Sequence, residues 1–594
     1  MKWFFEVRGD DDAAGRDDDD SAPGLISLPP ALLQRHGALA LHPADAAGIP
    51  SRIPGRPPAP PPRPTIYRAR TLLIPADLLI PDDGQEESAF ISASNMVLAR
   101  VGMRLVQPAV GREGARREGP GSGILGTLPR PAVLVPAVPE EGGPARPVVV
   151  NAWVALQALR DAAAAQEDQA PDEPTVSKVT LEHLHISSSI TGSGVHGHGG
   201  GLTGGPDHSS GVTGPGTTDS YTYSGGDTRT PVVVSLDPPY RDPAESFIGK
   251  YGRRPVVAVL DTGVRAHPWL GVEGNPHDGY AFAPDSFVVI DNAMQHAIYQ
   301  EGKNAADDGD RPRRLIEHPW DTPSTANPLV GELDTDFGHS TFIAGLVRQV
   351  APNAQVLAVR IMHSDGIAYE GDLIHALGLL AERVASAEAG DLAGMVDVVS
   401  LSLGYFDESP ADVTFSSGLW QAIEILLGLG VAVVAAAGNY STSRAFYPAG
   451  FSRWPRQDPV PLISVGALNP NGSKALFSDD GNWVTAWASG AAVVSTFPTD
   501  ANGSRSPEIR MRARPANEMP PVAGLPGERE SLDPDNYSDG FAAWSGTSFS
   551  APLLAAQIAR ALLEGAAARP LNLAGAQAAT DRAMAALTAM DWPG

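Results

Sequence analysis

The sequence predicts an α/β protein: a parallel sheet with helices on both faces, preceded by a small α+β module of ferredoxin-like order. In the C-terminal half, short apolar runs alternate with amphipathic stretches, the pattern of parallel strands joined by helices. Upstream, the apolar segments follow the order β-α-β-β-α-β, which is typical of a ferredoxin-like unit. At 594 residues the chain is long enough for several domains.

The N-terminal third divides into three parts. Residues 1–64 combine acidic clusters with a Pro-rich stretch, so we expect a mostly extended tail. Residues 65–185 are expected to form the ferredoxin-like module, with strands near 72–74, 103–106, 132–135 and 176–184 and helices near 90–101 and after Asn151. Residues 186–245 are rich in Gly, Ser and Thr, and we interpret them as a flexible linker.

Residues 246–566 are expected to form the main α/β domain. Its predicted strands and helices are, in order, strands 256–260, 356–361, 396–401, 431–437 and 462–465 and helices 373–387, 415–429 and 551–563. The long interval between Asp261 and His339 and the polar stretch 499–539 are expected to be inserted loops, the first of them near the cleft. Residues 567–594 are Ala-rich, and we expect a C-terminal helical segment.

Composition narrows the classes of partner. The chain carries 69 acidic and 43 basic residues, a net charge of −26, which argues against nucleic-acid and anionic-membrane partners. It has no cysteine, so disulfides and thiolate metal sites are excluded. The N-terminal apolar patch is too short for a signal-peptide core and no apolar run reaches membrane-spanning length, so we expect a cytoplasmic protein.

Three polar side chains lie where catalytic groups collect in such folds. Asp261 ends an apolar strand, His339 opens a helical stretch, and Ser548 lies at a loop-to-helix junction. A hydroxyl at a helix N-terminus lies near unsatisfied N–H groups that stabilise developing negative charge. Each motif alone also fits a core strand or a capped helix. The Asp-Thr-Gly at 261–263 matches the aspartic-protease tripeptide too, but that mechanism needs a second copy, which the sequence lacks.

The order Asp, His, Ser along the chain is that of the subtilisins, and over residues 247–563 the sequence resembles the subtilisin-like serine proteases. Segments 433–439 and 400–404 also match. The resemblance implies a triad of Asp261, His339 and Ser548, with Asn439 as the oxyanion donor. It also implies a substrate-binding set of Ser402, Leu403, Gly404, Ala436, Gly438 and Phe446. Ser340 departs from the family, in which a glycine follows the histidine.

The resemblance also carries expectations about cofactors. The reaction requires none. Structural calcium is common in the family, but no acidic cluster here has a spacing that assigns a calcium or other metal site.

Two functions from different classes remain. The first is a serine endopeptidase acting on protein or peptide substrates inside the cell, with the N-terminal module as an intramolecular inhibitor. In that case we expect residues just after Leu184 to lie along the cleft and any self-cleavage to fall between Ser187 and Thr230. A bulky Phe446 would shorten the S1 pocket and favour small or medium apolar P1 residues. The alternative is a catalytically silent peptide-binding or scaffold protein with the same fold.

Overall fold

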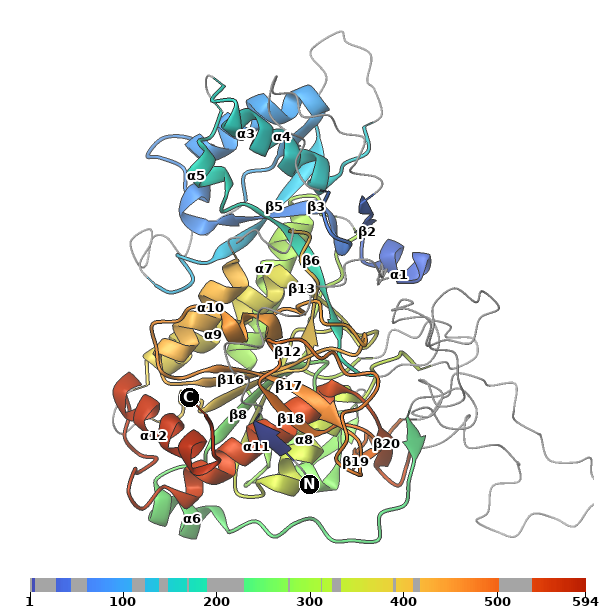
Figure 1. Ribbon diagram of the computed structural model, residues 1–594, viewed down its shortest axis with the longest axis vertical. Coiled ribbons are helices and arrows are strands. Elements are labelled where there is room, and N and C mark those ends of the chain that lie inside the picture. The colour runs from blue at the N-terminus through green and yellow to red at the C-terminus, as the bar shows by residue number, and fades with distance from the viewer. Residues whose placement is uncertain are drawn as a thin grey trace, which may run out of the picture.

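The protein is described by a computed structural model in which two compact units lie one above the other (Figure 1). The structure describes residues 3–5, 28–43, 61–108, 123–137, 148–167, 170–189, 229–275, 278–310, 312–322, 333–387, 392–409, 417–501 and 537–593. The lower unit in this view contains the main sheet, and the upper unit is the N-terminal module.

The main sheet has the strand order β1-β18-β17-β16-β14-β8-β12-β11, and every neighbouring pair except β1–β18 is parallel. The strands are β1 (Trp3–Phe5), β8 (Val256–Asp261), β11 (Val288–Ile290), β12 (Gln355–Arg360), β14 (Val398–Leu401), β16 (Ala432–Ala436), β17 (Leu462–Leu468) and β18 (Ala486–Ser489). The central strands are almost entirely apolar because both faces of the sheet are covered. The parallel sheet expected from the apolar runs is therefore present.

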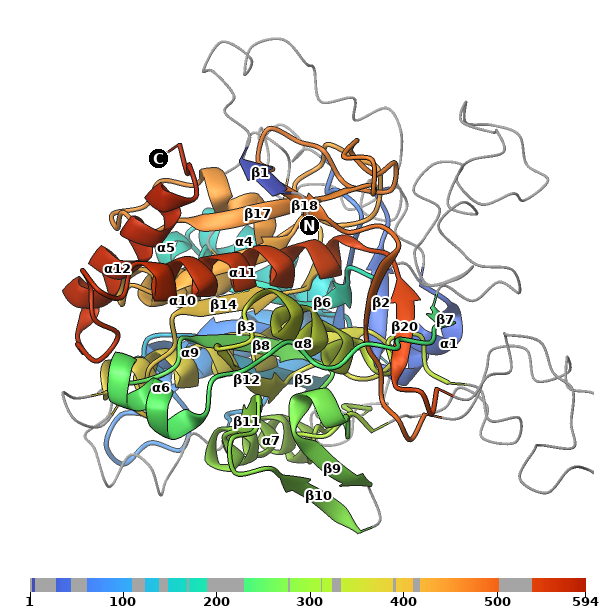
Figure 2. The same cartoon turned by 90° about the horizontal axis from the view of Figure 1, so that it is seen from below.

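Helices cover both faces of this sheet. On one face α8 (His339–Val350) packs against α11 (Thr547–Glu564), while α7 (Asn292–Asp307), α9 (Glu370–Ala385) and α10 (Gly418–Gly428) form a layer on the other. Figure 2 shows α11 running across the strands with α12 (Ala576–Ala589) packed beside it. None of the helices in the described part of the chain has the length and apolar composition that a membrane span needs.

Smaller elements surround the main sheet. They are the helix α6 (Ala244–Tyr251), the hairpin of β9 (Val272–Asn275) and β10 (Gly279–Phe282), and the three-stranded sheet of β19 (Val493–Thr496), β20 (Phe541–Trp544) and β7 (Thr230–Pro231). Short 3-10 helices cover Ala76–Leu79, Ala99–Val101, Pro268–Leu270 and Ala449–Arg453.

The N-terminal module has its own sheet, helices and apolar core. Its elements are β3 (Thr65–Pro75), α3 (Ala89–Leu98), β4 (Met103–Leu105), β5 (Pro129–Pro136), α4 (Ala152–Ala164), α5 (Glu173–Val176) and β6 (Thr180–Ser187). The sheet order is β6-β3-β5-β4 with all neighbours antiparallel. Asn151 caps α4, its side-chain oxygen accepting from the N–H groups of Trp153 and Val154.

One strand of the module continues into the main domain. β6 pairs with β3 inside the module, and its last residues pair antiparallel with β13 (Ile367–Tyr369) and with β15 (Leu403–Gly404). Figure 1 shows β6 running downward from the module toward the lower unit. The two units therefore share backbone hydrogen bonds as well as side-chain contacts.

Buried charges also join the two units. Arg313 of the main domain lies between Glu182 on β6 (3.2 Å) and Asp372 on α9 (2.5 Å), and Arg68 on β3 contacts Asp310 (2.5 Å). All of these side chains are buried. Removing one member of such a network leaves an unpaired buried charge, at a cost of about 3–5 kcal/mol.

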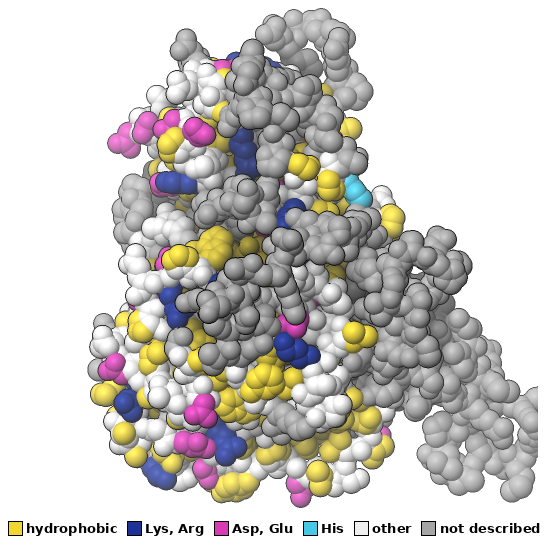
Figure 3. Space-filling view, viewed as in Figure 1, with side chains coloured by type: hydrophobic (Ala, Val, Ile, Leu, Met, Phe, Trp, Pro, Cys, Tyr) yellow, Lys and Arg dark blue, Asp and Glu magenta, His cyan; other side chains and the backbone are white. Residues whose placement is uncertain are grey.

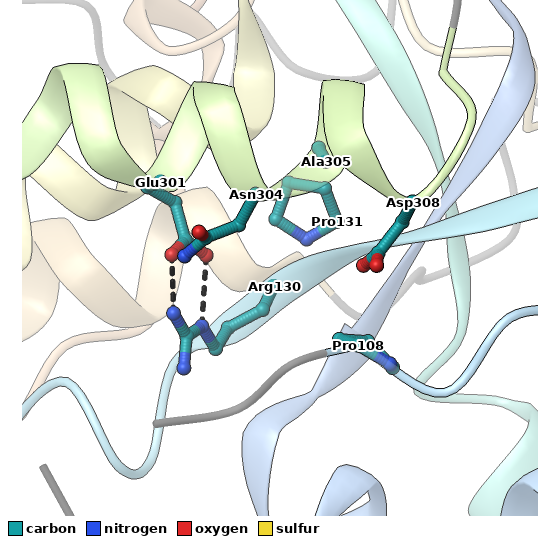
Figure 4. A pocket seen from close by; sticks show the side chains of 7 residues that line it. All are labelled: Pro108, Arg130, Pro131, Glu301, Asn304, Ala305 and Asp308. Atoms are coloured by element: carbon teal, nitrogen blue, oxygen red, sulfur yellow. Dashed lines mark hydrogen bonds and ion pairs between the residues drawn. The ribbon is translucent and has the colours of Figure 1, made fainter. Parts of the chain in front are cut away.

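A second ion pair lies beside this network. In the hollow between β5 and α7, the guanidinium of Arg130 meets the Glu301 carboxylate in a two-pronged ion pair, with Asn304 and Asp308 further along the helix (Figure 4). The contact between the two units is thus polar at several points, and ion pairs hold the charged side chains at these two.

The structure corrects three expectations from the sequence. Residues 1–64 are not all extended tail, because β1, α1 (Pro30–Arg35) and β2 (Ala38–Leu41) are ordered. The interval between Asp261 and His339 is not all loop, because it contains the helix α7, and Arg313 within it faces the module. The interpreted linker is ordered at both ends, at 186–189 and 229–245, whereas 190–228 lie outside the described residues, as do 502–536 of the second insertion.

Candidate active site

Asp261 and His339 meet at one edge of the main sheet. Asp261 is the last residue of β8, and His339 is the first residue of α8, after Gly338 with a left-handed φ of +84°. His339 Nδ1 lies 2.8 Å from Asp261 Oδ1 and 3.0 Å from Oδ2. Both side chains are buried. Burial alone would lower the pKa of His339, but the charge and hydrogen bond of Asp261 outweigh it and raise that pKa above its usual value.

Ser548 is the second residue of α11, so its N–H is one of the free donors at that helix start. Its hydroxyl donates to the carbonyl of Ser402 (3.1 Å), and the Ser402 hydroxyl donates to the Ser548 carbonyl (2.8 Å). His339 Nε2 is buried and has no hydrogen-bond partner. The nucleophile–base hydrogen bond that the resemblance implies is therefore not formed in this arrangement.

Asn439 lies one turn beyond the end of β16, where its amide is fixed by the neighbouring helix start. Asn439 Oδ1 accepts from the Thr547 backbone N–H (3.0 Å) and hydroxyl (2.9 Å). This leaves Nδ2 to donate on the side of Ser548. Gly438, at a φ of +108°, forms the turn that carries Asn439 there. Ala436 is the buried last residue of β16 and lies in the wall behind this turn.

The donors beside Ser548 are occupied by a backbone carbonyl of the chain itself. The oxygen of Ser188 accepts from the Ser548 N–H (2.9 Å) and from Asn439 Nδ2 (2.5 Å). Two convergent donors on one carbonyl oxygen form the geometry of an oxyanion hole. Ser188 therefore lies where the residue before a scissile peptide bond, P1, would lie.

The residues before Ser188 lie as a strand between two edges of the main domain. On one side the Ser188 N–H donates to Ser402 O (3.0 Å), and Leu403 and Gly404 pair with Ser187 and Ile186. On the other side the Ser187 N–H donates to Gly366 O (2.8 Å), and β13 pairs with residues 184–186. The predicted set Ser402, Leu403 and Gly404 thus borders a bound strand, and residues after Leu184 lie where we expected them.

Phe446 fills the space next to P1. Its side chain is fully buried, and ring atoms lie 2.4 Å from where a Cβ on Gly404 would stand and 3.0 Å from one on Gly438. The ring therefore lies between the two glycine-lined walls. Behind it are the rings of Phe406 and Tyr440, at centroid distances of 5.1 and 5.7 Å. The ring of Phe446 therefore leaves only a shallow pocket for the side chain at P1.

Sequence reasoning missed three residues of this site. Ser188 contributes only its backbone. Asp321 accepts from the Gly338 N–H (2.7 Å), and burial raises the pKa of this carboxyl to about 7. Arg229 is buried and donates to the carbonyls of Asp334 (2.8 Å), Thr335 (3.1 Å) and Phe337 (2.7 Å), directly before His339. A lone arginine at the end of a Gly-rich stretch gives no sequence signal of this role.

On the face of the molecule shown in Figure 3, charged side chains of both signs are interspersed among the described residues. In the lower part of the face shown in Figure 3, neither Lys and Arg nor Asp and Glu side chains of the described residues form a continuous patch. That face therefore does not single out a charged partner.

A parallel α/β fold with an Asp–His pair and a serine at a helix start beside it is typical of one class of protein, the serine endopeptidases. Comparison with known proteins gives the family: the model of the subtilase family matches residues 252–577, more than half of the chain. The chain belongs to the subtilase family. The module, β6 and Arg229 all lie upstream of the matched region.

Individual relatives are similar at a modest level. Subtilisin BL of Lederbergia lenta is 28% identical over 265 residues, 43% of this chain and 71% of the relative. Thermitase of Thermoactinomyces vulgaris is 31% identical over 179 residues, 28% of this chain and 55% of the relative. The thermophilic serine proteinase of Bacillus sp. (strain AK1) is 30% identical over 242 residues, 41% of this chain and 45% of the relative. The chain thus spans about half the length of the last two.

Proposed function

We propose that this protein hydrolyses peptide bonds with Asp261, His339 and Ser548 as the catalytic triad. Ser548 Oγ attacks the carbonyl carbon while His339 Nε2 takes its proton, and Asp261 holds the imidazole in the required tautomer. His339 then gives this proton to the leaving amine, and an acyl-enzyme on Ser548 remains. Water attacks the acyl-enzyme while His339 takes a proton from the water, and the proton returns to Ser548 as the product acid leaves. The Ser548 N–H and Asn439 Nδ2 bind the oxyanion. Every group in this mechanism comes from the chain, so no cofactor is invoked.

The observation that carries this proposal is the Ser188 carbonyl between the Ser548 N–H and Asn439 Nδ2. For the reaction, Ser548 Oγ must leave the Ser402 carbonyl and turn to His339 Nε2, whose bonding capacity is unused. This positions the Ser188–Ser189 bond as the first bond that the enzyme would cut.

We further propose that residues 65–185 are a ferredoxin-like prodomain that inhibits the enzyme in cis. The module's order β6-β3-β5-β4 supports the ferredoxin-like assignment, and the entry of β6 into the cleft supports the inhibitory role. A segment attached to the same chain competes with substrates at a high effective concentration. Because Arg229 holds the segment before His339, the active enzyme must retain it, which confines processing to the stretch between Ser188 and Arg229.

Intact mass of the full-length protein and of Ser548→Ala tests these proposals. The wild type should give two fragments, the first of which ends at Ser188. The Ser548→Ala protein should stay whole, and its fold should be unchanged because only one hydroxyl is removed. A fluorophosphonate probe should label the wild type at Ser548. Full peptidase activity in the Ser548→Ala protein would refute the triad.

The rival function is a catalytically silent peptide-binding protein, favoured by one observation, the missing hydrogen bond between Ser548 and His339. Absence of probe labelling in a protein whose module has been removed upstream of Arg229 would support it. Action in the cytoplasm stays a prediction from the sequence, and fractionation of the producing cells would test it.

A further inference from the structure

The strand in the cleft carries a charged side chain well upstream of Ser188. His183 on β6 occupies position P6 when Ser188 is P1, and it is buried. Its Nδ1 lies 2.7 Å from Glu370 Oε2, and its Nε2 lies 2.8 Å from Glu408 Oε2. The ring stacks on Tyr405 with centroids 4.3 Å apart and an angle of 24° between the planes. The imidazole is therefore clamped on two edges and one face.

These contacts require an imidazolium. Only the protonated ring has two N–H donors, and both nitrogens face carboxylates, which accept. Burial would lower the pKa of His183, but the charges of Glu370 and Glu408 raise it well above its usual value. A third carboxyl, Asp407, adjoins the group, and burial together with the charge of Glu408 raises its pKa to about 7.

The acids and the cation belong to different units. Glu370 begins α9, and Asp407 and Glu408 follow β15, so all three stay with the main domain. His183 belongs to the module, as does Arg160, whose charge also acts on Glu408. When the module leaves, these cations leave with it. A substrate strand that takes the place of β6 covers these carboxylates again, and a cation at its P6 position restores the pairing that His183 made, whereas a neutral side chain there does not.

The next side chain on the same face of the strand has no charged partners. His185, at P4, also lies against Tyr405 with centroids 4.7 Å apart, but both of its ring nitrogens are buried without a hydrogen-bond partner. Burial lowers the pKa of His185 well below its usual value. The P4 position thus accommodates a flat neutral ring. Of the two histidine positions, only P6 has carboxylates that pair with a positive charge.

We propose that Glu370, Asp407 and Glu408 form a cation-binding subsite, and that the enzyme prefers protein substrates with Lys, Arg or His at P6. This inference rests on the proposed endopeptidase function and names its substrate class. His183 itself lies close enough to Asp407 and Glu408 for these three side chains to hold a metal ion. Both nitrogens of His183 are already bonded to carboxylates, which favours the ion pair over a metal.

The first test uses the full-length protein after self-processing and quenched fluorescent peptides with the sequence of residues 181–192. Peptides with His, Lys, Gln or Glu at position 183 are compared. We expect kcat/KM for the Lys peptide to exceed that for the Gln peptide by about 10- to 100-fold, the range of a buried charged hydrogen bond. In Glu408→Gln this ratio should fall to within about twofold of one. The matched control Glu317→Gln, an exposed carboxylate, should keep the wild-type ratio.

The second test follows the self-cleavage itself by intact mass and needs no release of the module. His183→Gln should slow the cut at least as much as the peptide ratio indicates, whereas His183→Lys, which keeps the charge, should restore most of the rate.

Four outcomes overturn the subsite: equal rates for the Lys and Gln peptides, a Glu peptide cut as fast as the Lys peptide, equal slowing by both His183 substitutions, or a preference that EDTA abolishes, which would assign a metal. Failure to cut any peptide, the Gln peptide included, would count against the proposed endopeptidase function instead.

Discussion

Replacing Phe446 should deepen the pocket beside P1 and change which residues the enzyme cuts after. The buried ring lies between Gly404 and Gly438, so we expect only a small or medium P1 side chain, such as that of Ser188, to fit in the wild type. Phe446→Ala and Phe446→Gly remove the ring and leave a hollow that opens toward P1. Phe446→Leu, which fills part of the hollow, completes a series of side-chain sizes at this position. A change in P1 selectivity that follows side-chain size reflects the depth of the pocket rather than loss of folded protein.

The magnitude follows from two opposing terms. Removing a buried Phe side chain destabilises a protein by about 3–5 kcal/mol, so the Ala and Gly variants should melt earlier. A Phe at P1 that enters the hollow regains the burial of an aromatic side chain, about 1.5–3 kcal/mol. That corresponds to a gain of about 10- to 150-fold in kcat/KM for P1 Phe relative to P1 Ala.

The assay is kcat/KM for peptides that differ only at P1, measured for the processed wild type and the three variants, with Tm of each as the control for folding. The selectivity for P1 Phe should rise from Leu to Ala to Gly at position 446. Collapse of Phe406 or Tyr440 into the hollow would reduce the gain without reversing it. A wild type that prefers Phe, Tyr or Arg at P1 would refute the reasoning, as would an unchanged profile in a folded Gly variant.

Three further predictions concern the catalytic groups. Asn439→Leu removes one of the two donors to the oxyanion and should lower kcat by about 10²- to 10³-fold, the loss measured for this type of donor in a subtilisin, with little change in KM. Because the pKa of His339 is raised with the cleft occupied and the base must be neutral, kcat should fall as pH drops through a value above 6.5; an acid limb below 6 would contradict this. Arg229→Lys cannot reach all three carbonyls before His339, so kcat should fall about tenfold or more through misplacement of the base. Added guanidinium should restore part of the kcat lost in Arg229→Ala, and a rise in KM alone would argue against a positioning role.

The main sheet and the polar groups at its edge were accessible from the sequence because their signals are local. The run from Val256 to Leu260 is apolar since both faces of β8 are covered, and Asp261 is the first polar residue after it. His339 and Ser548 lie in the first turn of their helices, one and two residues after the glycines Gly338 and Gly546, and a glycine followed by a polar residue and an apolar helix is a local sequence signal.

The rest of the site depends on contacts between segments far apart in the chain. Ser188 acts through a backbone carbonyl, for which no residue type is diagnostic. The helix α7 buries Met294 and Ile298 in the core, but its buried face also carries Gln295 and Glu301, and Glu301 pairs with Arg130 of the module, so the apolar pattern of the helix is interrupted. The charge partners of His183 lie about two hundred residues away. Pairing of this kind appears only when the two units are placed together.

The strand β1 has a consequence for what processing would produce. It lies beside β18 at the edge of the main sheet (Figure 2), where the two strands pair antiparallel. Phe5 of β1 packs edge-on against Trp592, which follows α12. A cut after Ser188 would therefore yield two chains that stay associated. The shorter chain would contact the longer one at two separate places, through β1 and through the module with β6. While either contact holds, that of β1 with β18 or that of the module with the main domain, the other re-forms quickly, because the two chains stay close together. Departure of the shorter chain then becomes a slow, two-point event, and the moment of cleavage and the onset of activity are separated in time.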